Sequence, residues 1–519
     1  MENSNQITFL TTNRGNRQLI FQNHVFWFNK KKPNGRSLWR CSKGKSEQCR
    51  AYLTTGPNDE FVRVTEHSHG SNIPALKARM QRAEALDLAT KNPTLNPRRI
   101  LGDLAANHPQ DLNVSLEKSS EMAMSKAMRR ARNKELGYPK VPQTFAEVQA
   151  LQFPDRFSKT KAGDPFLVLK DFVTPTGGNS ENVMLLFLSP FGRQLLGTST
   201  MWTSDGTFKT TVKPFKQIYM VYGTTQDGQS LPAAYALLPS KDEEVYQRLW
   251  QQIEFEVSQD FPNHSPTKIM MDFEQAAKNA FIENFPDSEV VGCIFHFRKN
   301  FRHQLGKKGC LTLYDEDEDF QRIADQLMCL AYVPPTSIVT CFEAAIEPNI
   351  EKIESDLLEA AIDFFDYFVK TYIGRRAGRA GARRQPMFAH KWWSAYDQIL
   401  NDQAKTNNAQ EASNGVWNDN ADSNKSLWSV INGFQREDAL AKERFYRGVF
   451  GSEKSPTNSR ALDQAYRVEA LKKAAKMFGK VPAAEYLSLV RRAMYVKRPK
   501  HLGDGKLAAA SSSSTNPSC

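Results

Sequence analysis

The stretch MWTSDGTFKTT, residues 201–211, decides how the central part of this chain is interpreted. The residues before Asp205 predict a strand, and Asp205-Gly206 is a strong hairpin signal because both residues tolerate positive φ. An aspartate at a strand end has a second explanation, since its carboxylate is a good ligand for a divalent cation. We expect a turn at Asp205-Gly206 and, from the rest of the chain, metal binding as the reason for the aspartate.

The segments that follow predict a mixed sheet with helices on its faces. Short apolar runs read as strands, and longer runs with an amphipathic period read as helices. The predicted order is strands at 217–225 and 231–240, a helix at 243–261, a strand at 266–273, a helix at 274–285 and a buried strand at 289–297. Three strands, a helix, a strand, a helix and a strand are typical of a core in which helices cover a sheet.

Asp272 ends the apolar run KIMMD, much as Asp205 ends its own run. A carboxylate at the end of a buried strand loses hydration, and two on adjacent strands repel each other unless a cation lies between them. Mg²⁺ or Mn²⁺ prefers oxygen ligands, and a third carboxylate from a helix completes a site for two such ions. The alternatives are ordinary: Asp205 forms a turn, and Asp272 caps the helix that begins near residue 274.

Four motifs, SDGTFKT, MMDFEQAAKNAF, GCIFHFRKNF and NNAQEASN, arrive in the order found in the transposase domain of Mutator-like elements. The chain resembles that family over about residues 166–440. The resemblance implies a ribonuclease-H-like fold and a DDE triad, and it matches the triad to Asp205, Asp272 and Glu411. Spacing alone leaves Glu343 and Glu359 open as alternatives for the third acid.

Cys293 and His296 form a C-x-x-H pair in the third of these motifs. The resemblance implies a supporting role near the catalytic centre, whereas the ordinary alternative is a buried thiol beside a hydrogen-bonded histidine. Positions three apart on a strand face opposite sides, so the two side chains act together only at a strand end or turn. The segment that follows them is FRKNFRHQLGKKG. We expect its phenylalanines to pack inward and its cations to line a DNA path.

A second cluster lies near the N-terminus, in WRCSKGKSEQCRAY and VTEHSHG. Seven residues separate Cys41 from Cys49, and seventeen separate Cys49 from the H-x-H pair of His67 and His69. Two thiolates and two imidazoles suit a tetrahedral Zn²⁺ site, and a small β domain benefits from a metal because its core is small. We expect His67 and His69 to lie on one strand and to face the same side.

These residues, with Phe9, Leu19, Trp39 and the aromatics from Phe26 to Phe28, resemble a FLYWCH-type zinc finger over about residues 7–70. Such a finger implies DNA binding through a strand edge, with basic residues facing phosphate. An ordinary solvated charged face is the alternative. The DNA-binding candidates are Lys30, Lys31, Lys32, Arg36, Arg40, Lys43 and Lys45 in the finger, and Arg298, Lys299, Arg302, Arg375 and Arg376 further along, the last two in the Gly/Arg loop GRRAGRAGARR.

The composition agrees with a nucleic-acid partner. Lys and Arg number 69 against 57 Asp and Glu, which gives a net charge of +12. No apolar run approaches the length of a membrane span, the N-terminal residues do not resemble a signal peptide, and the seven scattered cysteines favour a reducing compartment. We therefore expect DNA as the partner, no membrane, and a location in the cytosol or nucleus, of which the transposase resemblance implies the nucleus.

The expected fold class is a multidomain α+β protein. It comprises a small β zinc finger, a helical linker domain, and a ribonuclease-H-like mixed α/β core with an all-α insertion. The expected segments are 7–70 (finger), 75–137 (helical, a candidate DNA-binding unit), 138–165 (connector), 166–440 (core, with the insertion at about 305–405), 441–500 (C-terminal helices) and 501–519 (disordered tail).

The resemblance then implies a DNA transposase that binds element ends, cleaves DNA and transfers strands, with Zn²⁺ in the finger and Mg²⁺ or Mn²⁺ in the core. It also implies a homo-oligomer on DNA. A domesticated DNA-binding regulator without transposition activity is the alternative, and an RNA-directed nuclease with the same fold is a third reading.

Overall fold

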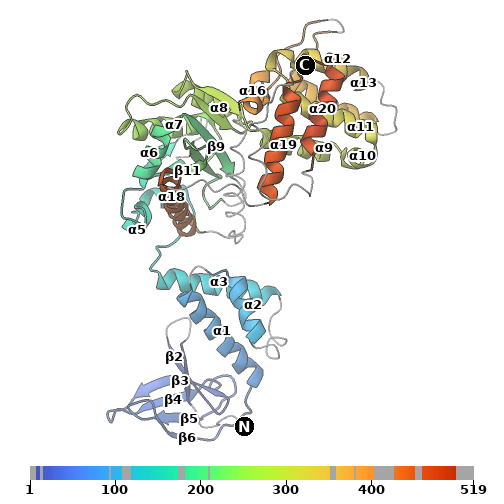
Figure 1. Ribbon diagram of the computed structural model, residues 1–519. Helices are drawn as coiled ribbons and strands as arrows, with labels where there is room; N and C mark the ends of the chain where they lie inside the picture. Colours follow the sequence, from blue (N-terminus) through green and yellow to red (C-terminus); the bar gives the residue numbers. More distant parts are fainter. Residues whose placement is uncertain are drawn as a thin grey trace, which may run out of the picture. The chain divides into compact units, whose positions relative to one another are not determined.

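The computed structural model describes most of the chain, which divides into two compact units, residues 1–140 and 141–519 (Figure 1). The described residues are 7–11, 16–92, 95–107, 118–173, 182–207, 211–350, 358–378, 381–401, 426–450 and 459–497. The predicted tail at 501–519 lies outside them.

The first unit begins with an antiparallel sheet of six strands in sequential order. The strands are β1 (Thr8–Thr11), β2 (Arg17–Phe21), β3 (His24–Lys31), β4 (Ser37–Cys41), β5 (Tyr52–Thr55) and β6 (Phe61–Val64). One face carries a small core in which Leu19, Phe26 and Trp39 are almost fully buried. A core of this size leaves the domain dependent on further constraints such as a metal.

Three helices complete the first unit: α1 (Ile73–Lys91), α2 (Pro97–Asn107) and α3 (Lys118–Glu135). As the Asn96-Pro97 pair predicts, α2 begins at Pro97, and the Asn96 side chain accepts a hydrogen bond from the Arg98 N–H at 2.8 Å. The basic cluster of α3 is partly structural, because buried Arg132 donates to the carbonyls of Ala89 and Leu95.

The second unit contains a seven-stranded mixed sheet in the order β13-β12-β9-β10-β11-β8-β7. Its strands are β7 (Leu167–Val173), β8 (Asn182–Leu188), β9 (Met201–Thr207), β10 (Gln217–Thr224), β11 (Ser230–Leu238), β12 (Lys268–Met271) and β13 (Glu289–Gly292). β9 pairs antiparallel with β10 and parallel with β12, and β12 pairs parallel with β13. The strand and helix succession predicted from the sequence is present.

Helices flank this sheet: α4 (Phe145–Ala150), α5 (Asp155–Ser158), α6 (Pro190–Thr198), α7 (Glu243–Ser258), α8 (Gln275–Asn284) and α18 (Leu427–Phe450). Helices α6, α7 and α8 pack on one face, in a core that includes Trp202, Ile269 and Met271. On the opposite face Phe434 of α18 stacks on Tyr235 with ring centroids 4.9 Å apart. The predicted boundary at 440 falls within α18, and the predicted connector contains α4 and α5.

A helical lobe joins the sheet after β13. It consists of α9 (Ile294–Lys307), α10 (Leu311–Glu316), α11 (Glu318–Cys329), η2 (Leu330–Tyr332), η3 (Pro335–Ser337), α12 (Ile338–Ala345), α13 (Glu347–Ile350), α14 (Leu358–Phe368), η4 (Val369–Ile373), α15 (His390–Trp393), α16 (Tyr396–Leu400), α19 (Ser459–Ala475) and α20 (Ala483–Tyr495). Although α18 intervenes in sequence, α19 and α20 share one core with α9 and α11, beside which they lie in Figure 1.

Gly292, the last residue of β13, fixes how the lobe meets the sheet. A Cβ at this position would lie 2.6 Å from both the Trp392 carbonyl oxygen and the Phe273 ring. Only a glycine permits this approach, which brings α15 against β13. Among the described helices, none is both long and apolar enough to cross a bilayer.

Candidate active site and zinc centre

Two parallel strands bring Asp205 and Asp272 together. β9 and β12 are in register with Met270 opposite Thr203, and each aspartate lies two residues further along its own strand direction. Residues two apart on a strand face the same side, so both carboxylates emerge at one edge and on one face. Because the carboxyl ends of parallel strands meet at the same edge, acids far apart in sequence become neighbours.

The pairing of residues across the sheet identifies the face on which the two aspartates lie. Asp205 lies opposite Met220, Met220 opposite Tyr235, and Tyr235 opposite Phe187. Directly opposed residues share a face, and Phe434 of α18 contacts both Tyr235 and Phe187. The aspartates therefore face the side covered by α18, while the alternating residues Trp202 and Met271 enter the core on the other side.

The hairpin prediction for Asp205-Gly206 is wrong. β9 continues through both residues to Thr207, and Asp205 and Gly206 pair with Met220 and Tyr219 of β10. Cross-strand pairing overrides the local turn preference of the dipeptide. Asp272 is not the cap of the next helix either, since Glu274 occupies the N-cap position of α8. Neither ordinary alternative accounts for the two aspartates.

His296 completes this cluster. The expected strand over 289–297 ends at Gly292, and Cys293 is the N-cap of α9, so the C-x-x-H pair spans a strand end and the first helical turn. His296 Nε2 lies 3.7 Å from a carboxylate oxygen of Asp205. Metal-binding atoms of Asp205, Asp272 and His296 all lie within 4.8 Å of one another, and we call these three residues the acidic site.

Burial and charge set the protonation of this site. Desolvation, with the nearby Asp205 carboxylate, raises the pKa of Asp272 from 3.8 to about 6, although His296 opposes the change. Burial alone would lower the pKa of His296, but contact with Cys293 and the two carboxylates raises it to about 9. The cation of His296 therefore partly balances two carboxylates, of which Asp205 is only 3% exposed.

Glu274 is a further acid that the sequence prediction did not assign. Its carboxylate accepts from the Tyr246 hydroxyl at 3.0 Å and from Lys241 Nζ at 3.3 Å, and its charge contributes to the raised pKa of Asp272. The signal was available, because Glu274 lies two residues after Asp272 within the same motif. We place it as a carboxylate held beside the site by Tyr246 and Lys241.

The donor set of the acidic site fits a divalent cation. The two converging carboxylates are oxygen ligands of the kind that Mg²⁺ or Mn²⁺ prefers, and protonated His296 lies beside them as a counter-charge and not as a ligand. Glu411 lies outside the described residues, so its place relative to the site is not tested. The other two candidates for the third acid are among the described residues. Glu343 belongs to an ion-pair cluster with arginine, and Glu359 lies on α14.

The N-terminal quartet of Cys41, Cys49, His67 and His69 also converges, with its ligand atoms within 4.8 Å of one another. Cys41 Sγ lies 3.2 Å from His69 Nε2, and Cys49 Sγ lies 3.5 Å from His67 Nδ1. The two histidines are not on a strand as expected, since β6 ends at Val64 and both follow it in a loop. A loop allows both rings to turn to one point without the alternation of a strand.

Neighbouring groups orient these ligands. His69 Nδ1 lies 2.7 Å from the Gly70 carbonyl oxygen, which leaves Nε2 for a metal. His24 stacks on His67 with centroids 3.7 Å apart, and burial with the nearby His24 and His69 lowers the pKa of His67 to about 4. Burial raises the pKa of Cys41. Burial also opposes ionisation of Cys49, but backbone and side-chain hydrogen bonds together outweigh it and lower the pKa of Cys49 to about 7. Two thiols and two imidazoles in this arrangement fit Zn²⁺.

Two family models match the chain. The MULE transposase domain matches residues 201–300, from the start of β9 to the middle of α9, and the FLYWCH zinc finger domain matches residues 9–69. Each match covers part of the chain, the first within the second unit and the second within the first unit. A search of curated proteins gives no match.

The MULE match includes Asp205, Asp272, Cys293 and His296, and it ends before Glu411. The FLYWCH match includes all four members of the quartet and ends at His69. Both resemblances inferred from the sequence are confirmed. The FLYWCH match and the convergent quartet together support zinc in the N-terminal domain.

Most DNA-binding candidates of the FLYWCH domain are exposed. Arg40 lies opposite Trp27 on the face away from buried Trp39, and Trp27 is itself 37% exposed. This strand face therefore combines an aromatic side chain with cations. Lys32 and Lys43 are half-buried, and Lys43 Nζ is paired with Glu47 at 2.7 Å.

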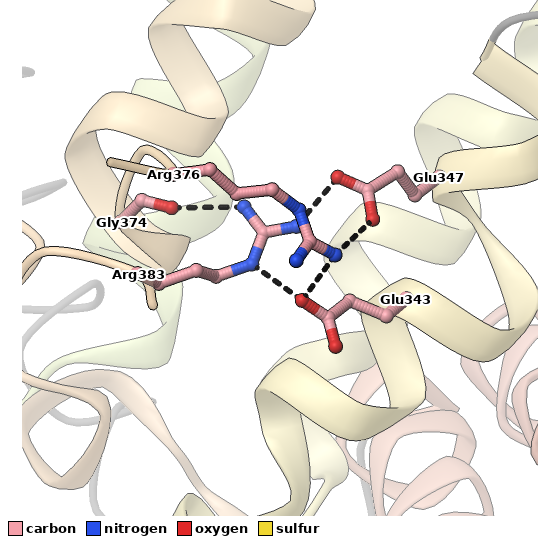
Figure 2. Close-up of polar contacts among 5 residues, drawn as sticks. All are labelled: Glu343, Glu347, Gly374, Arg376 and Arg383. Carbon is pink, nitrogen blue, oxygen red and sulfur yellow. Dashed lines mark hydrogen bonds and ion pairs between the residues drawn. The ribbon is translucent and has the colours of Figure 1, made fainter. Parts of the chain in front are cut away.

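The glycine spacing of the Gly/Arg loop GRRAGRAGARR predicts a flexible cationic loop, and the structure differs from this prediction. Arg383 donates to Glu343 at 2.8 Å, to Glu347 at 2.5 Å and to the Gly374 carbonyl, and Arg376 joins the same two glutamates (Figure 2). Arg375 is paired with Asp366. Ion pairs fasten the described part of the loop to α12 and α13, so Arg375 and Arg376 are engaged within the protein.

Proposed function

We propose that this chain is a DNA transposase of the Mutator-like type, which binds element ends and catalyses metal-dependent strand cleavage and strand transfer. The observation that carries the proposal is the convergence of Asp205, Asp272 and His296 within the MULE match. Bringing two carboxylates together on a buried face costs free energy unless a cation is bound there, so the arrangement favours a metal-dependent reaction.

The sheet supports a ribonuclease-H-like core. Counted from β9, three antiparallel strands are followed by two parallel strands on the other side of β9, and helices α7 and α8 make the two crossovers. A core of this kind places acids at the carboxyl ends of its first and fourth strands, which are the positions of Asp205 and Asp272. The part of the helical lobe that lies between β13 and α18 in the sequence is the proposed all-α insertion.

In this proposal Asp205 and Asp272 hold divalent cations, and Glu411 is the third acid of the DDE triad. Bound Mg²⁺ or Mn²⁺ would activate the attacking water or 3′-OH and stabilise the leaving oxygen. His296 holds the Asp205 carboxylate in place and balances part of the negative charge before metal and DNA bind. Cys293 follows β13 as the N-cap of α9, and its side chain contacts His296 in the first turn of that helix.

The FLYWCH domain would contact the element ends through its exposed basic and aromatic face, and this contact would depend on salt. We also propose a nuclear location and a homo-oligomer on DNA, in line with action on two element ends. The two intact aspartates give no support to the alternative of a regulator without activity.

The test is divalent-dependent cleavage of DNA carrying the inverted repeats that flank the gene. Asp205→Asn and Asp272→Asn should each abolish cleavage while the zinc content stays unchanged. Asp287→Asn, the same change at an exposed aspartate after α8, is the matched control and should retain activity. Full cleavage by either active-site variant would refute the assignment.

A further inference from the structure

A cavity of about 1050 Å³ lies in the helical lobe and is lined mainly by residues of α9, α11, α19 and α20. Figure 1 shows where these four helices lie in the lobe. Its described lining contains a single acidic side chain, Asp325, against several cations. These cations are Arg298, Lys299, Arg302, Arg467, Arg491 and Arg492. Such a surplus of positive charge in a concave site favours a ligand with more than one negative charge.

The single acid is already committed within the protein. Asp325 is 2% exposed and accepts hydrogen bonds from Arg491 at 2.7 Å, from Tyr314 at 2.6 Å and from Tyr495 at 2.8 Å. This network ties α20 to α10 and α11 and uses the charge of Arg491. The other five cations are left without an acidic counterpart among the described lining residues.

The cavity also presents aromatic rings. Phe295 is 39% exposed, Tyr495 is 46% exposed, and Tyr314 and Tyr332 lie deeper in the lining. Aromatic side chains beside a cationic groove are the combination that binds unpaired nucleotides, because the bases stack and the phosphates meet the cations. A duplex hides its base faces, so the rings would contribute little to duplex binding.

Helix α9 connects the cavity to the acidic site. In the sequence, the cavity residues Phe295 and Arg298 flank His296. Buried Phe297 anchors the helix by stacking on Trp393. Arg302 follows His296 by six residues, which is about 9 Å along a helix. A strand leaving the acidic site therefore needs to extend by only a few nucleotides to reach these cations, at about 3.4 Å for each nucleotide.

We propose that this cavity binds the unpaired nucleotides of the DNA strand next to the cleaved phosphodiester. The phosphates meet Arg298, Arg302 and Arg492, and a base stacks on Phe295 or Tyr495. The location next to the scissile bond rests on the proposed function, whereas binding of unpaired nucleotides by the cavity does not.

The test measures binding of a fluorescein-labelled ten-nucleotide oligo(dT) to the full chain, without Mg²⁺ and with zinc retained. Arg298→Glu and Arg492→Glu should each weaken binding about tenfold and make it less dependent on salt. Phe295→Ala should also weaken it about tenfold. Lys307→Glu, at an exposed cation of α9 outside the cavity, is the matched control and should change binding less than twofold.

Photocrosslinking with 5-iodouracil in the same oligonucleotide locates the contact. Crosslinks in α9 or α20 support the proposal, and crosslinks confined to residues 9–69 overturn it. If the cavity variants lose duplex binding as strongly as they lose oligo(dT) binding, the proposal is overturned. It is also overturned if free dTTP saturates the cavity and the oligonucleotide does not displace it. Asp205→Asn should abolish cleavage and leave oligo(dT) binding intact, so failure of the proposed function is distinguishable from failure of this inference.

Discussion

Asp272→Asn should make the second unit more stable when divalent cations are absent. The pKa of Asp272 is raised from 3.8 to about 6, mainly by burial. An acid whose pKa is raised on folding stabilises the folded state below the unfolded pKa, and this contribution is lost as pH rises through about 6. At pH 7.5 Asp272 is ionised in both states, so the full free-energy cost of burying its charge is present. The folded and unfolded pKa values differ by about 2, which corresponds to about 3 kcal/mol.

Asparagine has a similar shape and no charge, so it removes this penalty. The unit spans about 380 residues, for which an unfolding entropy of about 0.8 kcal/mol/K gives a rise in Tm of roughly 4 °C. The gain should shrink as pH falls from about 6 toward 3.8, because Asp272 is protonated in both states only below its unfolded pKa. Added Mg²⁺ should raise the Tm of the unsubstituted chain and narrow the difference, because the variant has lost a ligand.

The assay is differential scanning calorimetry at pH 4.5 and 7.5, with and without MgCl₂, and with Asp287→Asn as the control that should not shift. A Tm at pH 7.5 that is unchanged or lowered by Asp272→Asn would refute the reasoning. Such a result would mean that burying the ionised Asp272 carboxylate does not destabilise the folded state. The carboxylate would then have no need of a cation.

Three further outcomes are expected. His69→Ala should lose one equivalent of zinc by atomic absorption, whereas His303→Ala, at an exposed histidine of α9, should keep it; equal zinc in both would contradict the quartet. Arg383→Ala should cost about 1–3 kcal/mol in denaturant unfolding, because it removes a buried guanidinium and leaves Arg376 alone to balance two glutamates. Arg375→Ala, from an exposed pair, should cost less than about 1 kcal/mol, and equal costs would contradict the cluster in Figure 2. Burial raises the pKa of Asp438 to about 6, so Asp438→Asn should raise Tm more at pH 7.5 than at pH 4.5; the reverse order would contradict its buried pairing with Ser189.

The features that the sequence predicted well depend on residue type and short spacing. The quartet is recognisable because two cysteines and an H-x-H pair are rare together, and their chemistry is the same on a strand or a loop. The sequence did not predict that His67 and His69 lie in a loop. The H-x-H pattern fits both cases, because alternation on a strand and free rotation in a loop each bring the two rings to one side. Similarly, the acids at the ends of apolar runs identified the edge of the sheet before its strand order was visible.

The features that the sequence missed depend on contacts between distant segments. Asp205-Gly206 favours a turn locally, but pairing with β10 keeps it extended. The Gly/Arg loop has the composition of a flexible segment, yet Glu343 and Glu347, more than 25 residues away, bind its arginines. The return of α19 and α20 to the helical lobe, across α18, depends on packing that no local pattern records.

The central claim is that Asp205 and Asp272 are brought together to share a divalent cation. Electron paramagnetic resonance titration of the full chain with Mn²⁺ tests it directly, because it needs neither DNA nor activity. We predict a bound Mn²⁺ that is lost in both Asp205→Asn and Asp272→Asn and retained in Asp287→Asn. Mn²⁺ binding that is unchanged in either active-site variant would contradict the account.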